Sequence, residues 1–281
     1  MSTVRDNMHN NIDTLFANLW QDYLAITPSA HKIHQLLGEH ENAGQKDLVN
    51  DHIALRTFNI EKVALDKLAA HFLNLGYQEK GQYDFVQKKL RAKHFEHADT
   101  TKPKVFISEL LVEQLSESAQ NIINEMVENI ADDATTHSEF LYSGTHWQVS
   151  SEQYDELLAE SEYAAWVSAW GFRANHFTVS LNHMAHFQLL ADVNSKLKAS
   201  GFVLNSAGGE IKGGQDVHLA QSSTMADKIE VQFSDGKRVI PSCFYEFSQR
   251  YKMTCGNLYQ GFVASSADKI FESTNNSVSS S

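Results

Sequence analysis

The stretch Val49-Asn50-Asp51-His52-Ile53-Ala54-Leu55-Arg56-Thr57-Phe58 predicts a β-strand, because β-branched and aromatic residues are concentrated in it and polar and apolar residues partly alternate. Residues two apart in a strand share a face, so His52, Ala54 and Arg56 point to the same side. A metal ligand and a cation would then lie on one face, with a small alanine between them that leaves room for a bound molecule. Taken alone, the stretch is also compatible with polar residues on the solvated face of an ordinary strand.

A second segment repeats this pattern. Asn175-His176-Phe177-Thr178-Val179 again places an acid or amide before a histidine, followed by a bulky apolar, a small and an aliphatic residue. Each strand is followed by a helical pattern that ends at a glycine, Gly76 in the first copy and Gly201 in the second. The chain therefore contains a strand–helix unit twice, and two such copies would bring both imidazoles to a pseudo-twofold centre.

The composition limits the class of protein. A chain of 281 residues with 42% hydrophobic content can bury a sizeable core, and its net charge of -12 argues against a nucleic-acid partner. The sequence has no apolar run of about 18 residues that would cross a membrane, and no apolar segment typical of a secretory signal. Its 2 cysteines fit a reducing compartment. We therefore predict a cytoplasmic protein without nucleic-acid or membrane partners; a homodimer stays open.

A carboxylate lies in a third predicted strand. Asp235-Gly236 is a hairpin signal, and the strand after it is predicted over residues 238–250. Glu246 stands there among aromatic residues, which is unusual because a buried carboxylate needs a partner or a metal. A solvent-exposed glutamate stays open as the alternative. With His52 and His176 it would complete the two-histidine, one-carboxylate ligand set of non-haem Fe(II), which leaves positions open for substrate and O2.

Arg56 adds a candidate anchor to this ligand set. Its guanidinium would make a bidentate contact with a substrate carboxylate on the face that carries His52. A 2-oxo acid that binds the metal through its ketone and carboxylate oxygens would fill two positions and leave one for O2.

Four segments together resemble the DUF1338 family, which includes the 2-oxoadipate dioxygenase/decarboxylases and belongs to the vicinal-oxygen-chelate superfamily. They are Asn50–Phe58, Arg173–Thr178, Gln221–Thr224 and Tyr245–Arg250. The resemblance implies an α+β fold in which tandem βαβββ modules form a half-open barrel around one metal, with added N-terminal and inter-module helices.

The resemblance also implies roles for single residues. It implies that the ligands of an Fe(II) cofactor are His52, His176 and Glu246, and that Arg56 anchors the substrate carboxylate. Further candidate pocket residues are Gln221, Ser223 and Arg250, for which simple strand polarity is the alternative. No catalytic residue is predicted beyond the metal site.

The predicted organisation is a single compact domain with five parts. N-terminal helices packed on the barrel occupy 1–48, the first module 49–131, a helical connector 132–170, the second module with a C-terminal extension 171–272, and a disordered Ser/Asn tail 273–281.

The implied reaction is oxidative decarboxylation of a 2-oxo dicarboxylate with O2, so that 2-oxoadipate gives the 2-hydroxy acid 2-hydroxyglutarate and CO2. The chain departs from longer characterised members of the family, which have an added segment at the pocket, so the metal site carries over better than the substrate. Two alternatives stay open on the same fold. One is a lyase or isomerase that uses another divalent metal as a Lewis acid, and the other is a non-catalytic protein that binds a small acid.

Overall fold

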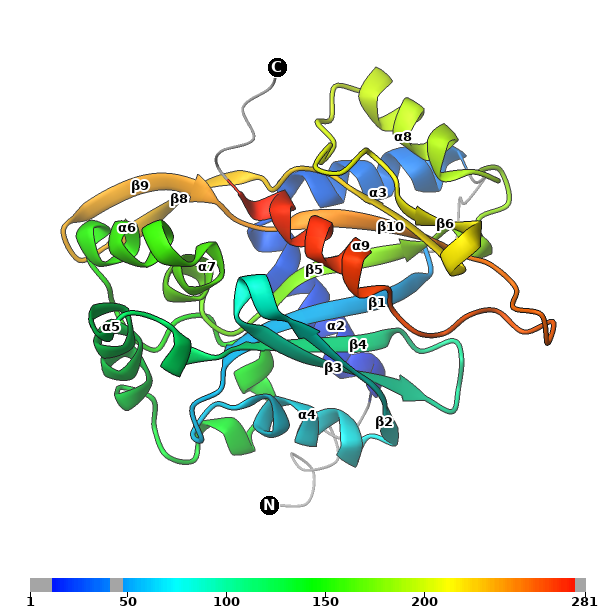
Figure 1. The fold of residues 1–281 in the computed structure, drawn as a ribbon. Helices are drawn as coiled ribbons and strands as arrows, with labels where there is room; N and C mark the ends of the chain where they lie inside the picture. Colours follow the sequence, from blue (N-terminus) through cyan, green and yellow to red (C-terminus); the bar gives the residue numbers. More distant parts are fainter. Residues whose placement is uncertain (1–11, 41–47, 276–281) are drawn as a thin grey trace, which may run out of the picture.

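The computed structural model describes residues 12–40 and 48–275. Its centre is an eight-stranded sheet with the strand order β2-β3-β4-β1-β5-β10-β7-β6, which curls into a half-barrel (Figure 1). The strands of this sheet are β1 Asn50–Phe58, β2 Tyr77–Phe85, β3 Leu90–His97, β4 Lys104–Leu110, β5 Ala174–Ser180, β6 Lys212–Gly214, β7 Leu219–Ser223 and β10 Phe244–Arg250.

The sheet consists of two copies of one βαβββ unit. The first runs β1-α4-β2-β3-β4 and the second β5-α8-β6-β7-β10, where α4 is Leu65–Asn74 and α8 is Leu190–Ala199. In each copy the first strand is parallel to the last, and antiparallel pairing of β1 with β5 joins the two copies. This arrangement confirms the predicted α+β fold of tandem modules.

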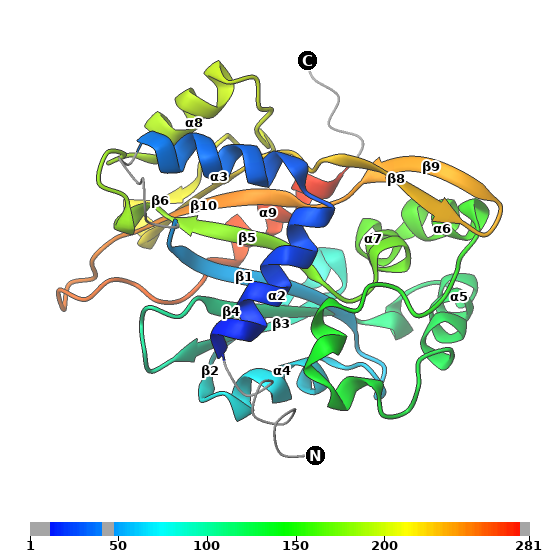
Figure 2. The ribbon, with the colours of Figure 1, turned by 180° about the vertical axis from the view of Figure 1, so that it is seen from behind.

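Helices cover both faces of the sheet. Figure 2 shows α2 (Ile12–Ala25) and α3 (Pro28–His40) on the face opposite to α9 (Ala264–Ile270). The segment of the chain between β4 and β5, which joins the two modules, contains α5 Glu117–Glu128, α6 Ser151–Glu160 and α7 Glu162–Trp170. Helix α9 contacts β2 and β6, the two edge strands, and so closes the open side of the half-barrel. No helix in the described ranges is both long enough and apolar enough to pass through a lipid bilayer.

In β5 and β10, alternate side chains point to opposite faces of the sheet, with most aromatic rings toward α2 and most polar groups toward α9. The ring of Phe177 in β5 packs against Trp20 of α2 with ring centroids 4.9 Å apart. Trp20 also packs against the ring of Tyr245 in β10, with ring centroids 5.9 Å apart. Because neighbours along a strand point to opposite faces, His176 and Glu246 are turned away from α2 and toward α9.

Two details of the prediction are corrected. The strand predicted over 238–250 is two strands, β9 (Gly236–Pro241) and β10, and β9 pairs only with β8 (Lys228–Phe233) in a separate hairpin. Pro241 has no N–H to extend the ladder. The disordered tail predicted over 273–281 is wrong for residues 273 and 274, because the 3₁₀ turn Phe271–Thr274 is ordered and the last residue of this turn is only 3% exposed. Residues 276–281 lie outside the described part of the chain.

Gly171 fixes the entry into β5, the strand that carries His176. It ends α7 with φ 66° and ψ -145°, a region that is essentially restricted to glycine. A Cβ atom there would lie 2.1 Å from the carbonyl oxygen of Gly144.

We expect Gly171→Ala to lower the free energy of unfolding by about 3 kcal/mol or more, measured by urea denaturation. Gly201→Ala is the matched control, since Gly201 also has a positive φ but no atom within 4 Å of the added Cβ. Equal losses in the two variants would contradict the role of the close contact.

Candidate metal centre

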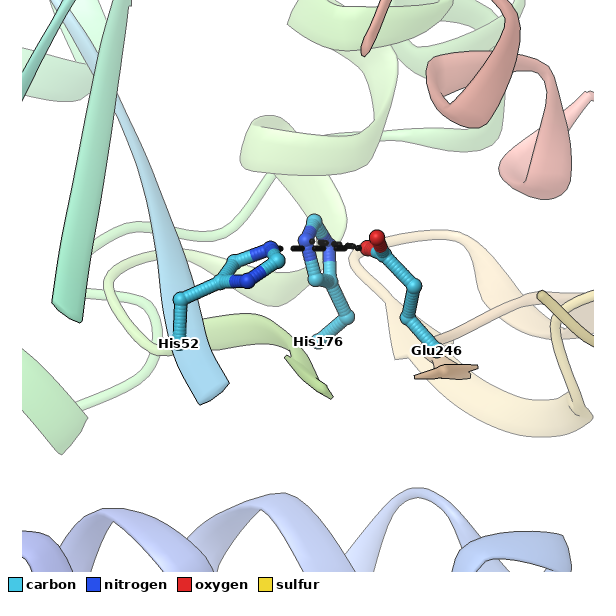
Figure 3. Close-up of side chains that lie close together, drawn as sticks. All are labelled: His52, His176 and Glu246. Atoms are coloured by element: carbon cyan, nitrogen blue, oxygen red, sulfur yellow. Dashed lines mark ion pairs between the residues drawn. The ribbon is translucent and has the colours of Figure 1, made fainter. Parts of the chain in front are cut away.

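Three side chains from neighbouring strands meet on the face of the sheet that α9 covers: His52 of β1, His176 of β5 and Glu246 of β10 (Figure 3). Their ligand atoms lie within 4.8 Å of one another, and all three residues are buried. Oε2 of Glu246 is 3.1 Å from Nε2 of His176 and 3.7 Å from Nε2 of His52. The strand register explains the convergence, because His52 and Glu246 are both paired with Thr178, which lies between them.

Each histidine is oriented by the residue before it. Nδ1 of His52 is 2.8 Å from Oδ1 of Asp51, and Nδ1 of His176 is 3.0 Å from Oδ1 of Asn175. Both oxygens can only accept, so in the neutral imidazoles each Nδ1 carries the hydrogen and each Nε2 carries the lone pair. The lone pair of His176 then faces Glu246 at 3.1 Å, and that of His52 lies 3.1 Å from the Thr178 hydroxyl and 3.7 Å from Glu246. Both are directed to one space, as a shared metal ion would require.

The group is electrostatically coupled. Burial by itself would raise the pKa of Glu246, but the neighbouring rings of His52 and His176 outweigh burial and hold this pKa well below its usual range. Burial opposes the charged form of His52, yet the Glu246 carboxylate and the hydrogen bond to Asp51 raise its pKa above 6.5. Burial dominates at His176 and lowers its pKa.

The donor set fits a divalent cation. Oε2 of Glu246 is fully buried and has no hydrogen-bond partner among the described residues, although buried polar atoms nearly always have one. The other oxygen, Oε1, accepts a hydrogen bond of 2.6 Å from Nε2 of Gln221, which fixes the carboxylate plane. Imidazole and carboxylate without thiolate suit iron, manganese, nickel or zinc, so the residues present fit a metal but do not select one.

The space around this group is small and is closed by the C-terminal segment. The cavity measures about 20 Å³, and its cover consists of Phe262, Ala267, Ile270 and Phe271. That volume holds about one water molecule, so a six-carbon acid needs the cover to move. A second cavity of about 210 Å³ lies on the other side of Phe271 and is lined by Glu162 and Tyr163.

Arg56 lies next to this second cavity. Its side chain is 1% exposed, and its guanidinium is 3.3 Å from Oε1 of Glu162 and 3.2 Å from Oγ1 of Thr274. It also packs over the ring of Phe271 at 5.7 Å. Nε of Arg56 has no partner among the described residues. Phe271 therefore separates Arg56 from the metal-ligand group.

The remaining predicted site residues have different positions. Gln221 lines the small cavity and bonds Glu246, whereas Ser223 forms a hydrogen bond with Ser273 and is not part of the lining. Arg250 does not line the cavity either, because it forms an ion pair with Asp51 behind His52. The sequence reasoning missed the orienting roles of Asp51 and Asn175, although the repeated acid-or-amide before each histidine was a visible signal. It also missed the covering residues Phe262 and Phe271, for which the sequence offers no comparable signal.

The raised pKa of His52 predicts how metal binding depends on pH. A bound metal requires the neutral imidazole, so uptake at low pH must release the proton held between His52 and Glu246. We expect affinity to fall by about tenfold per pH unit below the pKa of His52 and to level off above it, measured by chelator competition from about pH 6 to 8.5.

The stability of the metal-free protein should depend on pH in the opposite direction to metal affinity, decreasing as the pH rises. A raised folded-state pKa contributes stability that is present below 6.5, the usual value, and is lost as the pH rises through the folded value. An affinity that stays constant between about pH 6 and 8 would contradict the protonated state of His52.

Fold and site together define a half-barrel of paired βαβββ modules with a buried group of two histidines and one carboxylate at its centre. The sequence matches the 2-oxoadipate dioxygenase/decarboxylase family over residues 15–257, and the chain belongs to this family. Membership confirms the resemblance that the sequence motifs indicated.

Individual relatives agree with this assignment. The chloroplastic 2-oxoadipate dioxygenase/decarboxylase of Arabidopsis thaliana is 34% identical over 278 residues, covering 90% of this chain and 74% of the plant protein. A crystal structure from Shewanella frigidimarina, provisionally called a hydrolase, is 59% identical with a TM-score of 0.87, and the match covers 92% of this chain and 99% of that one. The hydroxyglutarate synthase of Oryza sativa, solved in complex with 2-oxoadipate, is 33% identical with a TM-score of 0.86, covering 94% of this chain and 91% of that chain.

Proposed function

We propose that this protein is an Fe(II)-dependent dioxygenase/decarboxylase that converts 2-oxoadipate into 2-hydroxyglutarate and CO2. The observation that supports it most strongly is the buried group His52, His176 and Glu246, in which a fully buried carboxylate oxygen lacks any hydrogen-bond partner among the described residues. Membership in the family and the similar rice enzyme with bound 2-oxoadipate support the choice of substrate. The cytoplasm remains the predicted location.

The proposed reaction is balanced without another co-substrate. 2-Oxoadipate and O2 give 2-hydroxyglutarate and CO2; the bond between C1 and C2 breaks, and C1 leaves as CO2. One oxygen atom enters the new carboxylate at the former C2, and the other becomes the hydroxyl group. When bound, Fe(II) supplies the electrons and the open coordination positions that O2 activation needs.

The residues of the chain hold and enclose the reactants. His52 and His176 present lone pairs to the metal because their Nδ1 atoms are engaged by Asp51 and Asn175. Gln221 holds Glu246 in place through a hydrogen bond of 2.6 Å. The aromatic cover would exclude water once substrate is bound, which protects reactive species from side reactions.

Arg56 is proposed to bind the distal carboxylate of the substrate. The strand rise of about 3.3 Å per residue separates the α-carbons of His52 and Arg56 by about 13 Å, which a side chain at each end and a six-carbon acid can span. For this contact Phe271 must leave its place between the two sites, and the acid would replace Thr274 as a partner of the guanidinium.

The shortness of the chain relative to some members of the family does not argue against this substrate. The chain covers 91% of the rice enzyme that was solved with 2-oxoadipate. The similar Shewanella structure is called a hydrolase, but the motif His-Glu-x-x-His, which marks one class of metal-dependent hydrolases, does not occur in this sequence.

The test is a single-turnover experiment. Metal-free protein is loaded with Fe(II) without air and mixed with 2-oxoadipate and O2, and the consumed O2, the evolved CO2 and the product are measured. We expect equal amounts of all three and no need for 2-oxoglutarate. Consumption of substrate without O2 would instead indicate a lyase or isomerase. A protein that takes up no divalent metal but binds the acid would be a binding protein.

A further inference from the structure

A buried ion pair lies behind His52. The carboxylate of Asp51 accepts two hydrogen bonds from Arg250, from Nε at 2.6 Å and from the NH2 nitrogen at 2.8 Å. Its Oδ1 also accepts the 2.8 Å hydrogen bond from Nδ1 of His52. The side chains of Asp51 and Arg250 are 4% and 3% exposed, so the chain His52–Asp51–Arg250 is shielded from solvent along its whole length.

A β-bulge explains how Asp51 reaches His52. In a regular strand the two neighbours would point to opposite faces. The pairing of β1 with β5 shifts by one residue between Asn50 and His52, so Asp51 is the extra residue on β1. Such a bulge changes the direction of a side chain, and bulges are over-represented next to active sites. The bulge therefore turns the carboxylate of Asp51 toward the imidazole ring of His52.

The second histidine has an equivalent partner in sequence but no ion pair behind it among the described residues. Nδ1 of His176 bonds to the neutral amide of Asn175, whose Nδ2 has no partner among the described residues. The same kind of bulge precedes it, because the pairing of β1 with β5 shifts again between Ala54 and Leu55, which makes Asn175 the extra residue on β5. The two modules thus hold equivalent histidines in different ways, one through an ion pair and one through an isolated amide.

Arg250 also holds the segment that covers the site. Its NH1 nitrogen donates to the carbonyl oxygens of Tyr259 at 3.0 Å and Gly261 at 2.8 Å. The next residue, Phe262, packs edge-on against the His52 ring with centroids 4.8 Å apart. One guanidinium therefore links the partner of a metal ligand to the backbone that positions the cover.

We propose that Asp51 and Arg250 are positioning residues of the metal centre. Asp51 holds His52 in the tautomer and orientation that direct Nε2 to the metal, and Arg250 holds both Asp51 and the backbone of residues 259–261. The inference rests on the proposed metal site, but it concerns metal binding and is independent of the substrate. Loss of such an outer partner typically weakens metal affinity by about 10- to 100-fold.

The experiment titrates Co(II), as a metal probe that needs no oxygen chemistry, into the metal-free full-length protein. Affinity is measured by chelator competition, the ligand field by the visible Co(II) spectrum, and stability by thermal unfolding of the metal-free form. Asp51→Asn gives His52 the kind of partner that His176 has. We expect this variant to bind Co(II) about tenfold more weakly with an altered spectrum, and Asp51→Ala about 100-fold more weakly.

A double variant separates positioning from stability. Asp51→Asn alone leaves the Arg250 charge buried without its partner, which lowers stability, whereas Asp51→Asn with Arg250→Gln removes both charges. We expect the double variant to recover most of the thermal stability but not the Co(II) affinity. Recovery of affinity and spectrum together with stability would overturn the proposal.

Arg250→Met tests the link to the cover. We expect faster amide hydrogen exchange at residues 259–262 in this variant and little change there in Asp51→Asn. Unchanged exchange in Arg250→Met would overturn this part. If the wild-type protein binds Co(II) but does not consume O2 with 2-oxoadipate, the proposed function fails and the positioning role stands. If the wild-type protein binds no Co(II), the positioning role also fails.

Discussion

Glu246→Gln is expected to abolish turnover of 2-oxoadipate and to weaken Fe(II) binding by more than about 100-fold, since loss of an outer-shell partner alone costs 10- to 100-fold. Glutamine keeps the volume of the side chain and can still accept the hydrogen bond from Gln221 at Oε1. It replaces the charged Oε2 atom, which both imidazoles face at 3.1 and 3.7 Å, by a neutral group. The measurements are metal content after dialysis, metal affinity and O2 uptake.

Glu109→Gln is the matched control for this substitution. Glu109 is also buried, at 2% exposure, and it accepts a hydrogen bond from the backbone of Leu65 and pairs with Arg91, away from the metal-ligand group. This variant should lose stability but retain metal and turnover. Wild-type metal affinity in Glu246→Gln would contradict the assignment of Glu246 as a ligand, and with it the proposed site.

Arg56→Met is expected to leave metal content unchanged and to raise KM for 2-oxoadipate by roughly 30- to 150-fold, corresponding to about 2 to 3 kcal/mol for a lost charged hydrogen-bonded contact. Methionine can replace the packing of the side chain against Tyr163 and Trp166. The former partner Glu162 is 24% exposed and can turn to solvent, so the fold should tolerate the change.

The chain length and charge of the substrate provide the control for Arg56. 2-Oxohexanoate has the same carbon chain but no distal carboxylate, so wild type and Arg56→Met should use it with similar KM values. Arg56→Lys should recover part of the loss, because an ammonium keeps the charge without the bidentate geometry. If Arg56→Met affects both substrates equally, Arg56 has a structural role only.

The sequence was sufficient to predict the repeat and the meeting of His52, His176 and Glu246 for a physical reason. Period-two alternation is a local property, so the strands around His52 and His176 and the face they share could be inferred from neighbouring residues. The glutamate was recognisable because a carboxylate flanked by Phe244, Tyr245 and Phe247 conflicts with ordinary burial preferences.

The positions of Arg250 and the C-terminal segment could not be predicted in this way. Alternation places Arg250 on the same face as Glu246, but its partner depends on a bulge in another strand, and bulges have no local sequence signature. Ser273 and Thr274 look like the start of a polar tail, but Ser273 contacts Ser223 and Asn205, and Thr274 contacts Arg56, all far away in sequence. The position of Arg250 and the order of the C-terminal segment both depend on tertiary contacts, which local sequence patterns do not reveal.

The duplication is imperfect at one position. His52 and His176 are equivalent by the repeat, so Ala54 corresponds to Thr178, and the strands paired with these residues place Phe106 opposite the first and Glu246 opposite the second. Full symmetry between the two copies would place a second glutamate where Phe106 stands. Because a hydrocarbon ring lines that wall instead, the small cavity has carboxylate and imidazole groups on one side and aromatic carbon on the other. A molecule bound in it would therefore meet polar partners on one side only.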